Sequence, residues 1–266
     1  MIGGSLAYLV ETGTSTVNPA FALSGSANWG ATNAVFIAGN SSPPVSPALV
    51  SHVALIGNGT TSEIDTTGAT LLVVNTTAFL GGGPVPTITD SKGNTWHALT
   101  QHSNNSYAQQ LFYAWNPTVG TGHTFTGTGG FASTFEVAAF SGIKTTADPF
   151  EVEAGAGVTG FDGQGGSVTA TVPGSLYISG FGLQNNQPSN ETSGLDLGFV
   201  MTDNTSNPTQ TSFISGALAY LVQSSTTARN PTWFTRTSSQ NFAIGNAVFA
   251  PAASPSVTRH GGGTFR

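Results

Sequence analysis

Apolar and polar residues alternate in this chain over short runs, and almost no run repeats at helical spacing. The clearest example is 132–141, where Phe135 and Val137 share one face of an extended segment and Glu136 lies on the other. Strands of this kind bury one face and leave the other for water or a partner. We therefore expect Glu136 to point outward, into solvent or an interface.

Such strand signals recur along the whole chain, between clusters of Gly, Pro, Asn and Ser that are typical of turns. One turn is 90–94 (DSKGN), in which Gly93 stands where a tight hairpin needs a positive φ. The predicted strands are 5–10, 34–38, 50–56, 69–76, 86–90, 96–101, 109–116, 123–128, 132–141, 167–172, 175–183, 198–203, 213–223, 233–237 and 246–250. This pattern predicts an all-β fold, an antiparallel β-sandwich of jelly-roll or Ig-like type.

One part of the sequence occurs twice. Residues 4–10 (GSLAYLV) return as 216–222 (GALAYLV), and 33–36 (NAVF) return as 246–249, in the same order and with a one-residue slip. A Pro-rich segment follows each copy, so the repeated unit marks the end of a domain. The predicted organisation is an N-terminal hairpin over 1–38 that repeats 215–250, a Pro/Ser linker over 39–48, a β-sandwich domain over 49–250 and a flexible tail over 251–266.

An isolated hairpin is at best marginally stable in water, so the N-terminal copy needs a sheet to join. Its apolar residues predict an assembly surface made of Leu6, Tyr8, Val10, Val35 and Phe36. Three outcomes stay open at this point. The hairpin docks on its own domain, it adds to a sheet of a neighbouring subunit, or it is the remnant of a truncated gene.

Composition narrows the function classes. Lys and Arg number 6 against 12 Asp and Glu, which excludes the basic footprint of a nucleic-acid-binding protein. The absence of Cys excludes thiol catalysis and Cys-ligated metals, and the apolar runs are too short for membrane insertion. The start, MIGGSLAYLV, lacks the basic region of a signal peptide. Low charge without a visible signal peptide predicts a virion or extracellular-surface protein.

Candidate catalytic groups are sparse. Glu151 and Glu153 would share a face of an extended segment, as a glycosidase pair must, but a solvated loop explains them better. His97 and His102 would face opposite sides of a strand, which argues against shared metal ligation. No Gly-x-Ser-x-Gly elbow stands between a strand and a helix. We therefore predict no catalytic residue, no metal site and no cofactor.

Aromatic residues favour one binding site. Trp96, Tyr107, Tyr113 and Trp115 fall in one predicted hairpin region, beside several Asn and Gln side chains. Aromatic rings can stack on sugars while amides donate and accept hydrogen bonds. The four aromatic residues are therefore candidate glycan contacts, with an ordinary sandwich core as the alternative.

Three segments carry a resemblance to a known module: 88–96 (ITDSKGNTW), 110–117 (QLFYAWNP) and 132–143 (ASTFEVAAFSGI). They resemble a β-sandwich module common in tailed-phage virion proteins and bacterial cell-surface proteins. The resemblance implies a jelly-roll or lectin-like sandwich with structural or display roles, and it brings no catalytic motif.

The sequence thus predicts a non-enzymatic structural protein of a phage-like virion or surface fibre, either a capsid decoration or a tail or fibre component. Its expected partners are copies of itself and other virion or surface proteins, met through β-strand contacts. The alternative is a lectin-like sandwich that attaches to host or surface glycans. Nucleic acid and membrane insertion are not expected.

Overall fold

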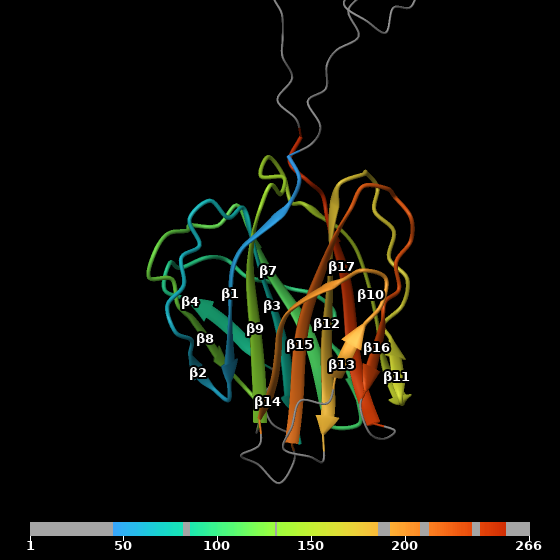
Figure 1. Ribbon diagram of the computed structural model, residues 1–266. Coiled ribbons are helices and arrows are strands. Elements are labelled where there is room, and N and C mark those ends of the chain that lie inside the picture. Colours follow the sequence, from blue (N-terminus) through green and yellow to red (C-terminus); the bar gives the residue numbers. More distant parts are fainter. Residues whose placement is uncertain are drawn as a thin grey trace, which may run out of the picture. The chain divides into compact units, whose positions relative to one another are not determined.

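The computed structural model describes residues 45–81, 86–130, 132–185, 192–207, 213–235 and 240–253, and every regular element in these ranges is a β-strand. The strands form antiparallel sheets that pack face to face, which confirms the predicted all-β sandwich (Figure 1). The predicted N-terminal hairpin, with Leu6, Tyr8, Val10, Val35 and Phe36, lies outside the described residues, as does most of the predicted tail.

The first main sheet has the order β1-β9-β3-β7-β5, and β6 also pairs with β7. Its strands are β1 (Ala48–Ile56), β3 (Leu71–Phe79), β5 (His97–Ala98), β6 (His102–Asn104), β7 (Tyr107–Trp115) and β9 (Ala132–Ser141). The second main sheet has the order β10-β17-β12-β15-β14. Its strands are β10 (Phe150–Gly160), β12 (Ser175–Asn185), β14 (Val200–Asn207), β15 (Phe213–Gln223) and β17 (Gln240–Phe249).

Two small sheets cover the outer faces. The sheet β2-β8-β4 comprises β2 (Gly59–Thr60), β8 (Phe125–Thr128) and β4 (Thr87–Asp90), and it packs Phe125 against Phe135 and Val137 of the first main sheet. The sheet β11-β16-β13 comprises β11 (Asp162–Gln164), β16 (Thr232–Thr235) and β13 (Thr192–Leu195), and it packs Trp233 against Phe181 of the second. Both faces of each main sheet are therefore covered.

The four layers correct one expectation. Every residue of β9 from Ala132 to Phe140 is buried, because Phe135 and Val137 face the small sheet while Ala138 and Phe140 face the second main sheet. Glu136 is on the latter side and is fully buried. The expectation that it points into solvent is wrong, because the alternating pattern does not reveal that a second layer covers the strand.

The domain consists of two halves with the same topology. The first half is β1 to β9 and the second half is β10 to β17. In the main sheets, the order β1-β9-β3-β7 corresponds to β10-β17-β12-β15. In the small sheets, the order β2-β8-β4 corresponds to β11-β16-β13. The edge strands β5 and β6 correspond to β14. Irregular register recurs at the same place, opposite Phe140 in β9 and opposite Phe249 in β17. Isolated bridges also recur, Ile64 with His123 and Val168 with Arg229.

This topology changes the meaning of the sequence repeat. β15 and β17 do not pair with each other, because β12 lies between them and Leu176 pairs with both Val222 and Phe249. The segment 215–250 is therefore not a hairpin, and that prediction is wrong. It is the last three strands of the second half, which enter three different positions in two sheets.

Candidate functional site

The middle of the sandwich holds polar side chains from one half against glycines from the other. The side chains are Asn75, Thr77, Gln109 and Glu136, and the glycines are Gly180, Gly182, Gly216 and Gly245. A Cβ on Gly216 would lie 2.6 Å from Glu136 Oε1, and a Cβ on Gly245 would lie 2.7 Å from Gln109 Oε1. We call this set the polar–glycine interface. Each glycine is needed because a facing side chain fills its Cβ position.

The two sets occupy equivalent positions in the two halves. The pair Leu71–Phe140 in β3 and β9 corresponds to Leu176–Phe249 in β12 and β17. Four residues after the leucine in β3 and in β12, the paired residues are Asn75 with Glu136 in the first half and Gly180 with Gly245 in the second. In the same way, Thr77–Gln109 corresponds to Gly182–Gly216. At these equivalent positions the first half therefore has polar side chains, and the second half has glycines that leave room for them.

Glu136 is the charged group of this interface. Its carboxylate accepts a hydrogen bond from Asn75 Nδ2 at 2.8 Å and another from Thr205 Oγ1. Burial raises the pKa of Glu136 to about 7, and the charge of Asp203 adds to the rise. The hydrogen bonds act in the opposite direction, because they stabilise the charged form. Asp203 itself lies 3.1 Å from His52 Nδ1, so a side-chain hydrogen bond between β14 and β1 lies beside the buried carboxylate.

A second polar cluster ties the 90–94 turn to its surroundings. Asp90 Oδ1 lies 3.0 Å from His123 Nε2, and His123 Nδ1 lies 2.9 Å from Thr66 Oγ1. A hydroxyl, an imidazole and a carboxylate are linked here in the same order as in a catalytic triad. All three side chains are buried, however, so no substrate can reach the hydroxyl of Thr66 in this structure. Trp96 Nε1 donates to Asp90 Oδ2 at 2.8 Å. The cluster holds β4 and the following turn in place.

The structure separates the four predicted glycan contacts. Trp96 packs edge-on against Phe125 under the small sheet. Tyr107 is 5% exposed, and Tyr113 is 4% exposed and donates to Asp148 Oδ2 at 2.9 Å. Trp115 alone lines a surface pocket. Three of the four rings are therefore engaged in packing or hydrogen bonding within the domain.

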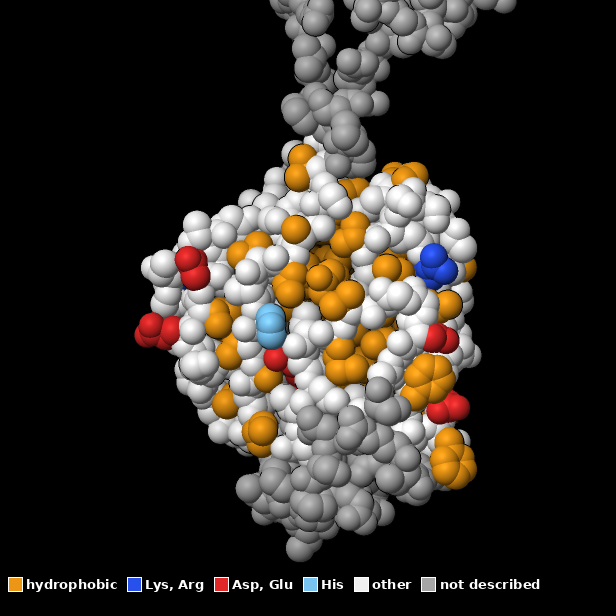
Figure 2. Space-filling model, viewed as in Figure 1, with side chains coloured by type: hydrophobic (Ala, Val, Ile, Leu, Met, Phe, Trp, Pro, Cys, Tyr) orange, Lys and Arg blue, Asp and Glu red, His pale blue; other side chains and the backbone are white. Residues whose placement is uncertain are grey.

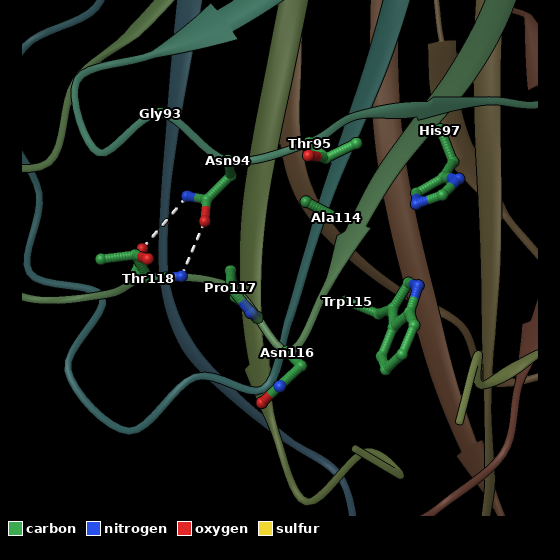
Figure 3. A pocket seen from close by; sticks show the side chains of 9 residues that line it. All are labelled: Gly93, Asn94, Thr95, His97, Ala114, Trp115, Asn116, Pro117 and Thr118. Atoms are coloured by element: carbon green, nitrogen blue, oxygen red, sulfur yellow. Dashed lines mark hydrogen bonds between the residues drawn. The ribbon is translucent and has the colours of Figure 1, made fainter. Parts of the chain in front are cut away.

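The pocket at Trp115 has a volume of about 330 Å³ and lies where β7 ends. His97 and Trp115 border one side of it, while Asn94 and Asn116 lie toward the other (Figure 3). The Asn94 amide is already engaged, because it donates to Thr118 O at 3.1 Å and accepts from Thr118 N at 2.6 Å. The pocket thus offers two rings with few free amide groups.

The two carboxylates considered for catalysis bind different parts of the chain. Glu153 accepts from Thr100 N at 3.0 Å, whereas Glu151 accepts from Thr171 N at 2.6 Å. The register shift between Phe150 and Val152 falls at Glu151 and separates the two side chains. The described residues contain no group of three His, Asp or Glu that could hold a metal ion.

The histidines His97 and His102 also lie apart. His97 is exposed and stacks on Tyr113 at 5.0 Å between ring centroids. His102 is on β6 and faces β10, where a Cβ on Gly155 would lie 2.0 Å from its Nε2. Burial lowers the pKa of His102, and the charge of Glu153 opposes this. These positions agree with the expectation that His97 and His102 do not bind one metal ion together.

Two long strand edges are open on one side of the domain. Among the described residues, β1 pairs with β9 alone and β14 pairs with β15 alone, and the two strands lie beside each other across the His52–Asp203 pair. Ile56 at the end of β1 is 51% exposed and Val200 at the start of β14 is 54% exposed. Figure 2 shows apolar side chains gathered over the middle of this face. We call the pair of strands the β1/β14 edge.

Sequence reasoning missed both the polar–glycine interface and the β1/β14 edge. The first had a signal, since glycines at alternate positions of predicted strands (180 and 182) mark a close approach. The second had none, because strand order is not visible in a single sequence.

Comparisons of the chain with protein-family models, curated proteins and solved structures gave no match. In the described ranges, no helix has the length and apolar character needed to cross a membrane.

Proposed function

We propose that this protein is a non-enzymatic structural component of a phage-like virion or surface fibre, and that copies associate through the β1/β14 edge. The observation that carries the proposal is the edge itself. β1 (ALVSHVALI) contains no Lys, Arg, Asp, Glu or Pro, the residues with which single-chain sandwiches blunt a strand edge. In the association that we propose, the backbone N–H and C=O groups on the outer side of β1 take part in strand addition.

The sequence supports the same assignment. The resemblance of 88–143 to a virion and surface module favours a structural role. The partners we propose are further copies and other proteins of the same particle or surface. An added role of Leu6, Tyr8, Val10, Val35 and Phe36 in assembly stays a prediction.

Light scattering after size exclusion tests the edge. We expect the full chain to be oligomeric and the variant Ile56→Lys/Val200→Lys to have the mass of a single chain, because two charges block strand addition. The matched control is Phe161→Lys/Phe234→Lys, which charges two exposed apolar residues at β11 and β16 and leaves the oligomer intact. A single-chain mass for the unmodified protein, or an oligomer that the edge variant retains, would refute the proposal.

The pocket at Trp115 favours a second candidate function, attachment to glycans. A ring beside His97 could stack on one sugar unit. Binding on a glycan array that is lost in Trp115→Ala and kept in Phe161→Ala would support it. An array without binding by the folded protein would rule it out.

A further inference from the structure

The pocket at Trp115 brings the polar atoms of two aromatic rings to one place. Figure 3 shows the indole nitrogen of Trp115 and one imidazole nitrogen of His97 pointing toward each other on one side of the pocket. His97 is held there by its stacking on Tyr113, with 5.0 Å between the ring centroids. In the part of the chain that the structure describes, neither Trp115 Nε1 nor a ring nitrogen of His97 is hydrogen-bonded to another residue. A ligand in the pocket would meet both groups.

The two nitrogens together suit a hydroxyl group. An indole N–H only donates, whereas a neutral imidazole has one donor nitrogen and one acceptor nitrogen. No hydrogen bond among the described residues fixes the tautomer of His97, so the nitrogen that faces Trp115 is able to accept. A hydroxyl group accepts and donates at the same time, whereas a carboxylate only accepts and an ammonium only donates. A ligand hydroxyl is therefore the group that can bind both rings.

The rest of the pocket has the size and character for one sugar ring. Its volume of about 330 Å³ is at the lower end of the ~300–1,000 Å³ that is usual for small-molecule sites. The indole of Trp115 is half-buried against the core of the sandwich, and its remaining face is a flat surface on which the C–H groups of a pyranose can stack. The exposed side chains of Thr95 and Asn116 also line the pocket and supply further hydrogen-bonding groups. These features fit a saccharide better than a purely apolar ligand.

The charges around the pocket favour an uncharged ligand. None of the described residues that line it is Lys, Arg, Asp or Glu. Two carboxylates lie one contact behind the lining. Asp148 Oδ2 accepts from the hydroxyl of Tyr113 at 2.9 Å, and Asp90 Oδ1 accepts from Asn94 Nδ2 at 3.1 Å. The ammonium of Lys92 donates to a backbone carbonyl outside the pocket, at 3.0 Å. A carboxylate on the ligand would thus approach two negative charges without a cation in the described lining.

We propose that the Trp115 pocket holds one neutral pyranose unit of a glycan, stacked on the indole, with one sugar hydroxyl bound between the ring nitrogens of Trp115 and His97. Sugars that carry a carboxylate, such as uronic acids, are disfavoured by the two carboxylates behind the lining. The inference rests on the glycan attachment proposed above and names the class of sugar that this pocket selects. It does not depend on the association of copies through the β1/β14 edge.

Two matched pairs of probes test the class of sugar. Methyl β-D-glucopyranoside and methyl β-D-glucopyranosiduronate share one ring and differ by a hydroxymethyl group against a carboxylate, and the corresponding galactose pair covers the other configuration at C4. Titration of the full chain at pH 8, followed by NMR, gives the dissociation constant of each probe. We expect a neutral glycoside to bind about tenfold more tightly than its uronate, because the carboxylate meets like charges. A uronate that binds as tightly as its neutral partner would overturn the inference and leave glycan attachment standing.

Two variants test the bound hydroxyl. Trp115→Phe keeps an aromatic ring and removes the N–H donor, and His97→Phe keeps a ring that can stack on Tyr113 and removes the acceptor. Each should weaken binding of the neutral glycoside about three- to tenfold. The control is Phe161→Ala, which truncates an exposed ring between β10 and β11 and should leave binding unchanged.

The remaining outcomes separate the inference from the proposals on which it builds. Unchanged binding in both ring variants would overturn the hydroxyl contact. If none of the four probes binds the folded protein, both the inference and glycan attachment at this pocket are wrong. Association through the β1/β14 edge is judged by the mass of the protein alone, so these results leave it unaffected.

Discussion

At the scale of single residues, Glu136 shows how the sandwich tolerates a buried acid. Its carboxylate is fully buried, and the space it occupies exists because Gly216 carries no side chain. Two donors, Asn75 and Thr205, compensate for part of the lost hydration. The protonated form still remains favoured up to about pH 7. Folding should therefore be coupled to the uptake of a proton.

This coupling predicts the direction of a pH effect. Between the ordinary value of 4.5 and about 7, the folded protein retains a proton that the unfolded chain has released, so stability falls as the pH rises through this window. The difference corresponds to about 3 kcal/mol. Urea unfolding at pH 5 and pH 8 measures it, and Glu136→Gln should remove it. His102, whose lowered pKa acts in the opposite sense, is common to both proteins. Equal pH dependence of the two would contradict the assignment.

At the scale of elements, the sequence predicted strands well where their own residues specify them. β7, β9 and β15 follow from alternation or apolar runs, and the 90–94 turn follows from Gly93, which has a φ of 74°. β10 (FEVEAGAGVTG) was missed because its glycines weaken the strand signal. They are required by a neighbour, since a Cβ on Gly157 would lie 2.1 Å from Ser103 O. Contacts between distant segments decide such strands.

The four predicted glycan contacts are separated in the fold for a related reason. Trp96, Tyr107 and Tyr113 are close in sequence, but each ring is on a different face or end of the first main sheet. Sequence proximity could not show which rings the facing layers would cover. Only Trp115, at the end of β7, was placed at an accessible pocket.

The turn at Asp90 predicts the stability of an element. Its carboxylate accepts hydrogen bonds from Lys92 N at 2.8 Å and Trp96 Nε1 at 2.8 Å, and it lies against His123. Asp90→Ala leaves these groups without an acceptor and should cost about 3 kcal/mol in unfolding free energy. The control is Asp65→Ala, which removes an exposed carboxylate bonded to Thr67 N and should change stability little. A similar loss in both variants would show that Asp90 is not the anchor of the turn.

At the scale of the whole molecule, two halves of one topology are joined by an interface that distinguishes them. Two first halves would bring Asn75, Gln109 and Glu136 against their own kind, and two second halves would leave glycine-lined voids. The interface thus specifies one pairing out of three. The two halves share little sequence, so the sequence alone did not reveal that they repeat one topology. It revealed only the separate repeat of 4–36 and 216–249, in which the residues themselves are similar.

The polar–glycine interface predicts coupling between Gln109 and Gly245, since the three atoms nearest to the Cβ position of Gly245 all belong to the side chain of Gln109. Gly245→Ala forces the Gln109 amide aside and should cost about 1–3 kcal/mol, whereas Gln109→Ala leaves a cavity. In the double variant the new methyl group enters the space that the amide left. Its loss of stability should therefore be smaller than the sum of the two single losses by about 1 kcal/mol or more, as measured by urea unfolding of all four proteins. Additive losses would mean that the two positions do not interact, and that the two halves are not matched at this point of their interface.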